Sequence, residues 1–261
     1  MQFFIYCMIA LVSAVISAIA GSLSIGSTLL VFLAVLLLCI FVHAMTIVIG
    51  SFFIDFENPP KKCGFFRYVT LATISLMHTY ARIIPKVIGR EKLPQEKFLF
   101  VSNHYSAYDP VIAMNCFKKY KLGFVSKKEN VNLPFVGKFM FASDVIPLDR
   151  ENPKSAVKTI SKAAENISSQ KCSMGIYPEG TRNKNPKEVK LQPFHDGSFK
   201  IATKSKAPIV VAVTRNTDRI TKSLFTRAVI EIVRVIDYSE YEGMKTNQIS
   251  QMVYKILEDS I

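Results

Sequence analysis

The sequence predicts an α/β domain with a mixed, mostly parallel sheet of about seven strands flanked by helices, preceded by an N-terminal two-helix membrane hairpin. Two observations support this prediction. No Asp, Glu, Lys or Arg occurs before Asp55 in a chain of 261 residues that is 49% apolar, which excludes both a single water-soluble globule and a disordered chain. From Pro85 onward, short apolar runs alternate with amphipathic segments, a pattern typical of a sheet covered by helices on both faces.

The first 54 residues contain two apolar runs, Phe3–Ala20 and Thr28–Ile54, separated by a break rich in Gly and Ser. About 20 apolar residues in a helix cross a bilayer, so both runs are long enough to span it, with a one-leaflet hairpin as the alternative. A cleaved signal peptide is disfavoured, because no basic residue precedes the first run and the second would still anchor the chain. The basic residues Lys61, Lys62 and Arg67 predict a cytoplasmic position for the remainder of the chain.

Residues 55–84 are predicted to form a juxtamembrane amphipathic helix. Between Phe65 and Ile84 the pattern is apolar and aromatic with basic and polar interruptions, which favours a helix lying at the membrane interface. We expect Pro85 to end this helix. A helix that packs on the following domain is the alternative.

Residues 85–261 are predicted to form one domain. The expected strands are Phe98–Ser102, Gly123–Ser126, Val145–Leu148, Met174–Tyr177, Ile209–Thr214 and Ala228–Val235, with Val87–Gly89 as a weaker seventh. The expected helices are Asn152–Ser168, Asp196–Ser205 and Thr246–Asp259. In such folds the functional residues collect in the loops at strand ends.

The charged part of the chain is strongly basic. It holds 33 Lys and Arg against 20 Asp and Glu, a net charge of +13, which favours an anionic bilayer or phosphate-bearing substrates as partners. Nucleic acid is the least favoured polyanion, because the chain has a predicted membrane anchor. The five cysteines are widely spaced and include no C-x-x-C pair, so we expect reduced packing residues and no metal site.

The first candidate site lies where the predicted strand Phe98–Ser102 ends. Asn103 and His104 follow that strand directly, and Asp109 lies five residues after the histidine. A carboxylate placed there can accept a hydrogen bond from one ring nitrogen and leave the other nitrogen as a base. The alternative is structural, because Asp before Pro110 is a common way to start a helix.

Two further strands end in residues suited to binding an anion. After the strand that ends at Tyr177 come Glu179, Gly180, Thr181 and Arg182. A glycine lets backbone N–H groups approach an anion, and an arginine can bind a phosphate through two hydrogen bonds. Arg150 follows another strand. The alternatives are a tight surface turn with a Glu–Arg pair and a solvated arginine.

In this order and spacing, these stretches resemble the 1-acyl-sn-glycerol-3-phosphate (lysophosphatidate) acyltransferase family of the glycerophospholipid acyltransferase superfamily, over about residues 85–215. The family's Asn-His-x4-Asp motif is matched from Asn103 to Asp109, and its Phe-Pro-Glu-Gly-Thr-Arg motif from Tyr177 to Arg182. The family's second motif, a strand ending in Arg, is matched by Val145 to Arg150. Its fourth motif, an apolar strand opened by Pro, is matched by residues 207–211. The departures are Asp144, or alternatively Ser143, for a usual Gly, Tyr177 for a usual Phe, and His195-Asp196 where a Lys and a Pro are common.

The resemblance implies an enzyme that transfers an acyl chain from acyl-CoA or acyl-ACP to the free 2-hydroxyl of 1-acyl-glycerol-3-phosphate, giving phosphatidic acid. It implies His104 as the base and Asp109 as its partner in a direct attack. The implied substrate-binding residues are Asn103, Arg150, Glu179, Gly180, Thr181 and Arg182. No cofactor or metal is implied beyond the thioester substrate.

The resemblance also implies where the enzyme works. We expect an integral membrane protein whose catalytic domain lies on the cytoplasmic face, where it meets lysophosphatidate in the bilayer and a water-soluble donor such as acyl carrier protein. One alternative is an acyltransferase acting on another lysolipid. A second is a catalytically silent membrane protein that binds anionic lipid. A hydrolase is disfavoured, because the chain contains no G-x-S-x-G sequence.

Overall fold

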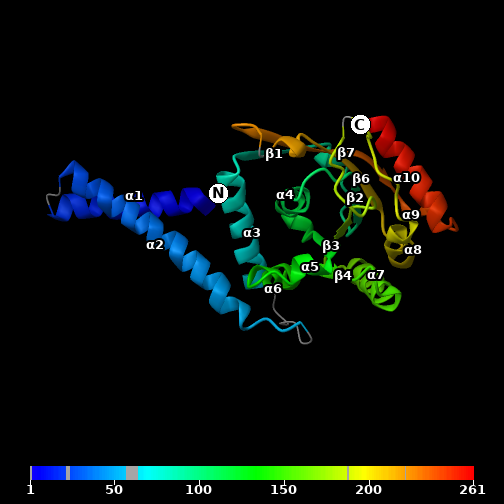
Figure 1. The fold of residues 1–261 in the computed structure, drawn as a ribbon, viewed down its shortest axis with the longest axis horizontal. Coiled ribbons are helices and arrows are strands. Elements are labelled where there is room, and N and C mark those ends of the chain that lie inside the picture. The colour runs from blue at the N-terminus through cyan, green and yellow to red at the C-terminus, as the bar shows by residue number, and fades with distance from the viewer. Residues whose placement is uncertain (1, 22–23, 57–63, 187, 221) are drawn as a thin grey trace. The chain divides into compact units, whose positions relative to one another are not determined.

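The structure is a computed structural model, and it describes residues 2–21, 24–56, 64–186, 188–220 and 222–261 (Figure 1). The helices are α1 (Gln2–Gly21), α2 (Ile25–Ser51), α3 (Gly64–Tyr80), α4 (Asp109–Cys116), α5 (Lys128–Val131), α6 (Val136–Ala142), α7 (Pro153–Ser168), α8 (Lys200–Ser205), α9 (Tyr238–Tyr241) and α10 (Thr246–Ser260). The strands are β1 (Ile83–Ile88), β2 (Leu99–Ser102), β3 (Gly123–Lys127), β4 (Val145–Leu148), β5 (Met174–Ile176), β6 (Ile209–Arg215) and β7 (Thr226–Ile236).

The chain forms two compact units. The helical unit comprises Met1–Thr79 with Leu133–Ser143, and the sheet unit comprises Tyr80–Asn132 with Asp144–Ile261. These units differ from the domain bounds we predicted, 1–54, 55–84 and 85–261, in two respects. The hairpin and α3 fall in one unit, and the segment Leu133–Ser143 joins them although it lies inside the predicted 85–261 domain.

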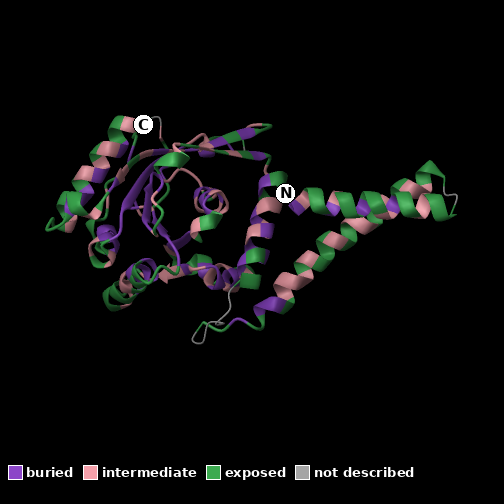
Figure 2. Ribbon diagram, turned by 180° about the vertical axis from the view of Figure 1, so that it is seen from behind, coloured by how far each residue is buried: buried purple, intermediate pink, exposed green. Residues whose placement is uncertain are grey.

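In the helical unit, α1 and α2 are each long and apolar enough to cross a membrane. Most of their large apolar side chains are exposed, and Figure 2 colours the two helices mainly green and pink, for exposed and intermediate residues. A helix that is apolar on all sides and not buried in protein is typical of a membrane span. The prediction of two N-terminal apolar helices is therefore confirmed. Lys61 and Lys62, on which the predicted orientation partly depends, lie outside the described residues.

A chain of hydrogen bonds joins the three long helices of this unit. The Tyr6 hydroxyl of α1 lies 3.0 Å from Nδ1 of His43 in α2, and Nε2 of the same imidazole lies 3.0 Å from the Thr73 hydroxyl of α3. The small residues Ala10 and Ala14 are buried along α1, which allows close approach of helices. Polar side chains on apolar helices thus find partners within the unit.

The helix α3 packs against α6 within the same unit. Val69 of α3 is buried with Phe139 of α6 in one apolar cluster, and the Thr70 hydroxyl donates to the Phe139 carbonyl at 3.3 Å. The buried Arg67 guanidinium donates to the Ser143 carbonyl at 3.1 Å. Arg67, Val69 and Thr70 therefore serve packing inside the unit.

The predicted end of this helix was wrong. The helix ends at Tyr80, and Pro85 lies inside strand β1. The sheet order is β1-β7-β6-β2-β5-β3-β4, so β1 is an edge strand with a single neighbour. An edge strand tolerates proline, because a residue on the open side needs no backbone N–H for pairing.

The seven strands form one sheet (Figure 1). The strands β6, β2, β5, β3 and β4 run parallel to one another, β7 is antiparallel to β6, and β1 is parallel to β7. The prediction of a mixed, mostly parallel sheet of about seven strands with flanking helices is confirmed. Because the five strands from β6 to β4 in this order are parallel, their carboxyl ends lie along the same edge of the sheet.

Two apolar layers cover the faces of the sheet. On one face, alternate residues such as Leu99 and Val211 pack with Ile167 of α7 and Val253 of α10 in a single cluster. On the other face, Phe100 contacts the rings of Phe117, just after α4, and of Phe124 in β3. The alternation follows from the two-residue period of a strand.

Asp144, which stands where the resembling family usually has a glycine, lies at a position with a left-handed backbone. Asp144 precedes β4 and has φ +67°, a conformation open to glycine and, among other residues, mainly to Asn and Asp. Its carboxylate forms an ion pair with Lys171 at 2.8 Å. Asp144 thus replaces the usual glycine and keeps the local turn before β4.

We expect Gly123→Ala to lower the free energy of unfolding by about 1–3 kcal/mol, because it overpacks a fixed contact. A Cβ at Gly123 would lie 2.2 Å from the Asp144 carbonyl oxygen, which is backbone and cannot rotate away. Gly197→Ala is the matched control, since a Cβ there meets nothing within 4 Å. Thermal unfolding in detergent micelles measures both, and equal losses in the two variants would contradict the expected clash.

Candidate active site

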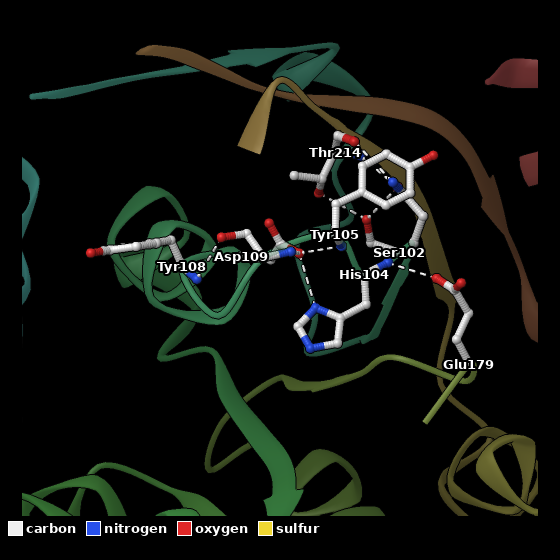
Figure 3. Close-up of polar contacts among 9 residues, drawn as sticks. Ser102, His104, Tyr105, Tyr108, Asp109, Glu179 and Thr214 are labelled. Atoms are coloured by element: carbon white, nitrogen blue, oxygen red, sulfur yellow. Dashed lines mark hydrogen bonds and ion pairs between the residues drawn. The ribbon is translucent and has the colours of Figure 1, made fainter. Parts of the chain in front are cut away.

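The candidate site is assembled at the carboxyl edge of the sheet. β2 lies between β5 and β6, with Val101 paired to Ile176 and Ser102 paired to Ala212. The loop after β2 carries His104, and the loop after β5 carries Glu179. The parallel pairing therefore brings two motifs that are 75 residues apart in the chain into contact, with a hydrogen bond of 2.7 Å between them (Figure 3).

His104 and Asp109 form a hydrogen-bonded dyad. Nδ1 of His104 lies 2.9 Å from Oδ2 of Asp109, and the two side chains are 17% and 0% exposed. When Nδ1 donates to the carboxylate, Nε2 keeps its lone pair and can accept a proton. The imidazole is reachable from solvent while the carboxylate behind it is not, which suits a general base with a buried orienting partner.

The Asp109 carboxylate also holds the turn that carries the histidine. Oδ2 accepts hydrogen bonds from the backbone N–H groups of Tyr105 (Figure 3) and Ser106, each at 2.8 Å. Both donors precede α4, so these bonds differ from those of a helix cap, in which the donors lie inside the helix. Asp109 therefore fixes the backbone and the imidazole of one short turn together.

Asn103 bonds to the neighbouring strand. Its side-chain Nδ2 donates to the Thr214 carbonyl at 2.9 Å, and its Oδ1 accepts from the Thr214 N–H at 2.7 Å. The residue is fully buried. We predicted a substrate contact for Asn103, whereas its amide extends the pairing of β2 with β6 just before His104. Thr214 was not identified from the sequence, because it bonds to Asn103 through its backbone; its hydroxyl lies 2.9 Å from the Ser102 hydroxyl.

Glu179 supports two loops from inside the protein. Oε1 accepts from the His104 N–H at 2.7 Å and Oε2 from the Gln192 N–H at 2.9 Å, and the residue is 2% exposed. Burial raises the pKa of the Glu179 carboxyl, against the smaller lowering from the two hydrogen bonds. The predicted substrate contact of Glu179 thus competes with two backbone bonds for the same oxygens.

Arg150 and Gly180 are in direct contact. The Arg150 guanidinium donates to the Gly180 carbonyl. Gly180 has φ +67°, and a Cβ there would lie 2.8 Å from Nε2 of His195 and 3.2 Å from the Arg150 guanidinium. Only glycine satisfies both the backbone angle and the close approach. His195 was not predicted as a site residue; the sequence marked it only as a departure, at a position where a lysine is common in the family.

Arg182 lines a polar pocket beside the turn that holds the dyad. The pocket has a volume of about 240 Å³, and its lining residues are Tyr105, Ser106, Ala107, Tyr108, Arg182, Thr217, Asp218 and Ile220. The Thr217 hydroxyl is buried and has no hydrogen-bond partner among the described residues. Thr181 is exposed next to Arg182. The structure therefore places the four predicted anion-binding residues in two groups, Arg150 with Gly180 and Thr181 with Arg182.

Within the part of the chain that the structure describes, no group of three or more His, Cys, Asp or Glu side chains could hold a metal ion. The thiols of Cys7, Cys39 and Cys116 are free.

The chain is similar in sequence to a known protein family and to several named enzymes. Residues 84–215, half of the chain, match the family model described as Acyltransferase. The chain is 30% identical over 179 residues to the 1-acyl-sn-glycerol-3-phosphate acyltransferase of Saccharomyces cerevisiae, covering 67% of this chain and 58% of that protein. It is 26% identical to the enzymes of the same name from Escherichia coli and Haemophilus influenzae, covering 70% and 87% of this chain and 78% and 92% of theirs.

A solved structure supports the fold. The chain is similar to the 1-acyl-sn-glycerophosphate (LPA) acyltransferase PlsC of Thermotoga maritima, with a TM-score of 0.61 and 20% sequence identity, covering 84% of this chain and 90% of that one. At this identity the likeness concerns the arrangement of helices and strands.

We expect Glu179→Gln to destabilise the protein by about 1–3 kcal/mol, because one of two backbone N–H groups would face an amide NH2 and lose its acceptor. Acyl transfer should fall as well, since the His104 N–H is one of the two donors. Urea unfolding and an acyl-transfer assay measure these effects. The exposed Glu258→Gln in α10 is the control, and a Glu179→Gln protein of normal stability would show that the two bonds contribute little.

Proposed function

Since the chain belongs to the acyltransferase family, we propose that it transfers an acyl chain from a thioester donor to the 2-hydroxyl of 1-acyl-glycerol-3-phosphate, giving phosphatidic acid. The observation that carries this proposal is the dyad of His104 and Asp109, with a free imidazole nitrogen at the carboxyl edge of the sheet. The names of the yeast and bacterial relatives support the acceptor.

In the proposed mechanism, Nε2 of His104 takes the proton of the acceptor hydroxyl while the oxygen attacks the thioester carbonyl carbon. The new C–O bond gives a tetrahedral intermediate, the C–S bond then breaks, and the leaving thiolate takes the proton back from the imidazolium. Asp109 keeps the proton of Nδ1 in place and stabilises the imidazolium. Direct transfer of this kind requires no Ser or Cys nucleophile.

The phosphate of the acceptor is proposed to bind at the turn after β5. Arg182 and Thr181 offer hydrogen-bond donors there, and Arg150 is tethered to that turn through the Gly180 carbonyl, while the Gly180 N–H donates within the turn to the Tyr177 carbonyl at 2.9 Å. Binding a phosphate at a fixed point places the acceptor hydroxyl within reach of the imidazole and removes much of the entropic cost of the encounter. We propose positioning roles for Asn103 and Glu179, because their side chains are buried and bonded to backbone groups.

The donor is proposed to be acyl-CoA or acyl carrier protein, used as a substrate, with no further cofactor. Both carriers are water-soluble and anionic, and the net charge of +13 favours either one. The acceptor and the product reside in the bilayer. We propose that α1 and α2 hold the protein there, with the site on the cytoplasmic face, in keeping with two helices long enough to span.

We expect His104→Ala to lower kcat about 10²- to 10⁴-fold, the range found for removal of a general base. Asp109→Asn should lower kcat less, since the base remains, and both variants should leave the affinity for the lysolipid nearly unchanged. The measurement is phosphatidate formed by membranes supplied with labelled lysophosphatidate and either acyl-CoA or acyl carrier protein.

Asp259→Asn, an exposed change in α10, is the matched control, and thermal unfolding confirms that each variant is folded. A folded wild-type protein that forms no phosphatidate with either donor would refute the proposed acceptor. Equal loss of lysolipid binding in both variants would instead assign His104 and Asp109 a structural role.

A further inference from the structure

The His104 ring is the first of three aromatic rings that stack face to face. The rings of His104 and Tyr177 are nearly parallel, with centroids 4.3 Å apart and planes inclined by 16°. The ring of Phe124 is parallel to Tyr177 within 7°, at a centroid distance of 5.4 Å. Tyr177 follows β5 directly and Phe124 lies in β3, so the stack links the two strands to the loop after β2.

A glycine in β5 makes room for this stack. Gly175 is paired with Phe124 of β3, and a Cβ at Gly175 would lie 2.3 Å from the Phe124 ring. The ring therefore lies directly over the glycine, a close approach that any side chain would prevent. Phe100 contacts the same ring edge-on, at a centroid distance of 6.2 Å. The Phe124 ring is therefore held in place against Tyr177.

The hydrogen bond to Asp109 does not by itself fix the plane of the imidazole. A hydrogen bond weakens steeply only below about 120°, so a ring held at Nδ1 alone can tilt through tens of degrees. Each tilt moves Nε2, the nitrogen that must meet the acceptor hydroxyl. A second contact, on the face of the imidazole, is needed to fix the plane of the ring and the position of Nε2.

We propose that Tyr177, supported by Phe124 over Gly175, is the positioning residue that sets the plane of the His104 imidazole and stabilises its protonated form through the face of its own ring. This inference rests on the proposed function, in which His104 becomes an imidazolium during transfer. An aromatic face attracts a cation placed over it, and a ring fixed before substrate binds loses no further freedom in the reaction.

The ring of Tyr177, and not its hydroxyl, carries this role. The hydroxyl is buried and has no hydrogen-bond partner among the described residues. Burial, with a smaller effect of the Asp109 charge, raises the pKa of Tyr177 well above its usual value, so the hydroxyl stays neutral. Removing an unpartnered polar group costs little, which makes Tyr177→Phe a conservative variant that retains the ring.

The test compares Tyr177→Leu, Tyr177→Phe and Phe124→Leu in the full chain, in membranes or detergent. We expect Tyr177→Leu to lower kcat about 3- to 10-fold, with the KM of each substrate changed less than twofold. Tyr177→Phe should retain most of kcat, and Phe124→Leu should give a smaller loss than Tyr177→Leu. Phe117→Leu is the control for loss of a buried ring, since Phe117 contacts Phe100 outside the stack.

Two results would overturn the inference. One is a kcat for Tyr177→Leu equal to that of Tyr177→Phe. The other is a higher KM at unchanged kcat, which would make the ring a substrate contact.

A double-mutant cycle of His104→Ala and Tyr177→Leu gives a readout independent of turnover. If the rings interact, the unfolding temperature of the double variant falls by less than the sum of the two single losses. Additive losses would overturn the inference even in an active enzyme. If the wild type forms no phosphatidate but the losses are not additive, the proposed acceptor fails while the ring contact stands, and the kcat comparison is repeated with other lysolipid acceptors.

Discussion

Parallel pairing of β2 with both β5 and β6 is the constraint on which the site depends. Because the three strands run in the same direction, the residues that follow them emerge at one edge, and the loop after β2 lies between the other two. Both sides bond to that loop: the Glu179 carboxylate, after β5, accepts from the His104 N–H, and the Asn103 side chain of the loop bonds to the backbone of Thr214 in β6. A shift of register in either pair would separate His104 from these supports.

The short turn from His104 to Asp109 is held by hydrogen bonds to two buried carboxylates and by one backbone bond. Asp109 accepts from Tyr105 and Ser106, Glu179 accepts from His104, and the His104 carbonyl accepts from the Asn183 N–H at 2.7 Å. A buried backbone group without a partner is costly, so this bonding leaves the turn few alternative conformations. The rigidity is local, and it lies where a base needs to be oriented before its substrate arrives.

Much of this arrangement could be predicted from the sequence. The apolar runs placed the strands within a few residues, since a buried parallel strand leaves a continuous apolar pattern, and spacing singled out His104 and Asp109. The roles of Asn103 and Glu179 could not be predicted, because their partners are backbone groups of Thr214 and Gln192 that have no side-chain signature.

Other features could not be predicted from the sequence, each for a different physical reason. Proline usually ends a helix, but Pro85 lies in a strand because β1 has an open edge. The Tyr177 stack depends on Gly175, and an isolated glycine in a strand does not reveal which ring lies over it. The assignment of Leu133–Ser143 to the helical unit depends on long-range packing with α3, which no local pattern encodes.

That discontinuous helical unit has a practical consequence for anyone who wants the sheet unit in water-soluble form. Deleting residues 1–79 would remove Val69, Thr70 and Arg67, yet α6 would remain in the middle of the shortened chain. Phe139 would lose its apolar neighbours, and the carbonyls of Phe139 and Ser143 would lose their donors. A soluble derivative therefore needs a redesigned 133–143 segment with polar replacements at Phe139 and Ala142, and simple truncation would yield a protein prone to aggregate.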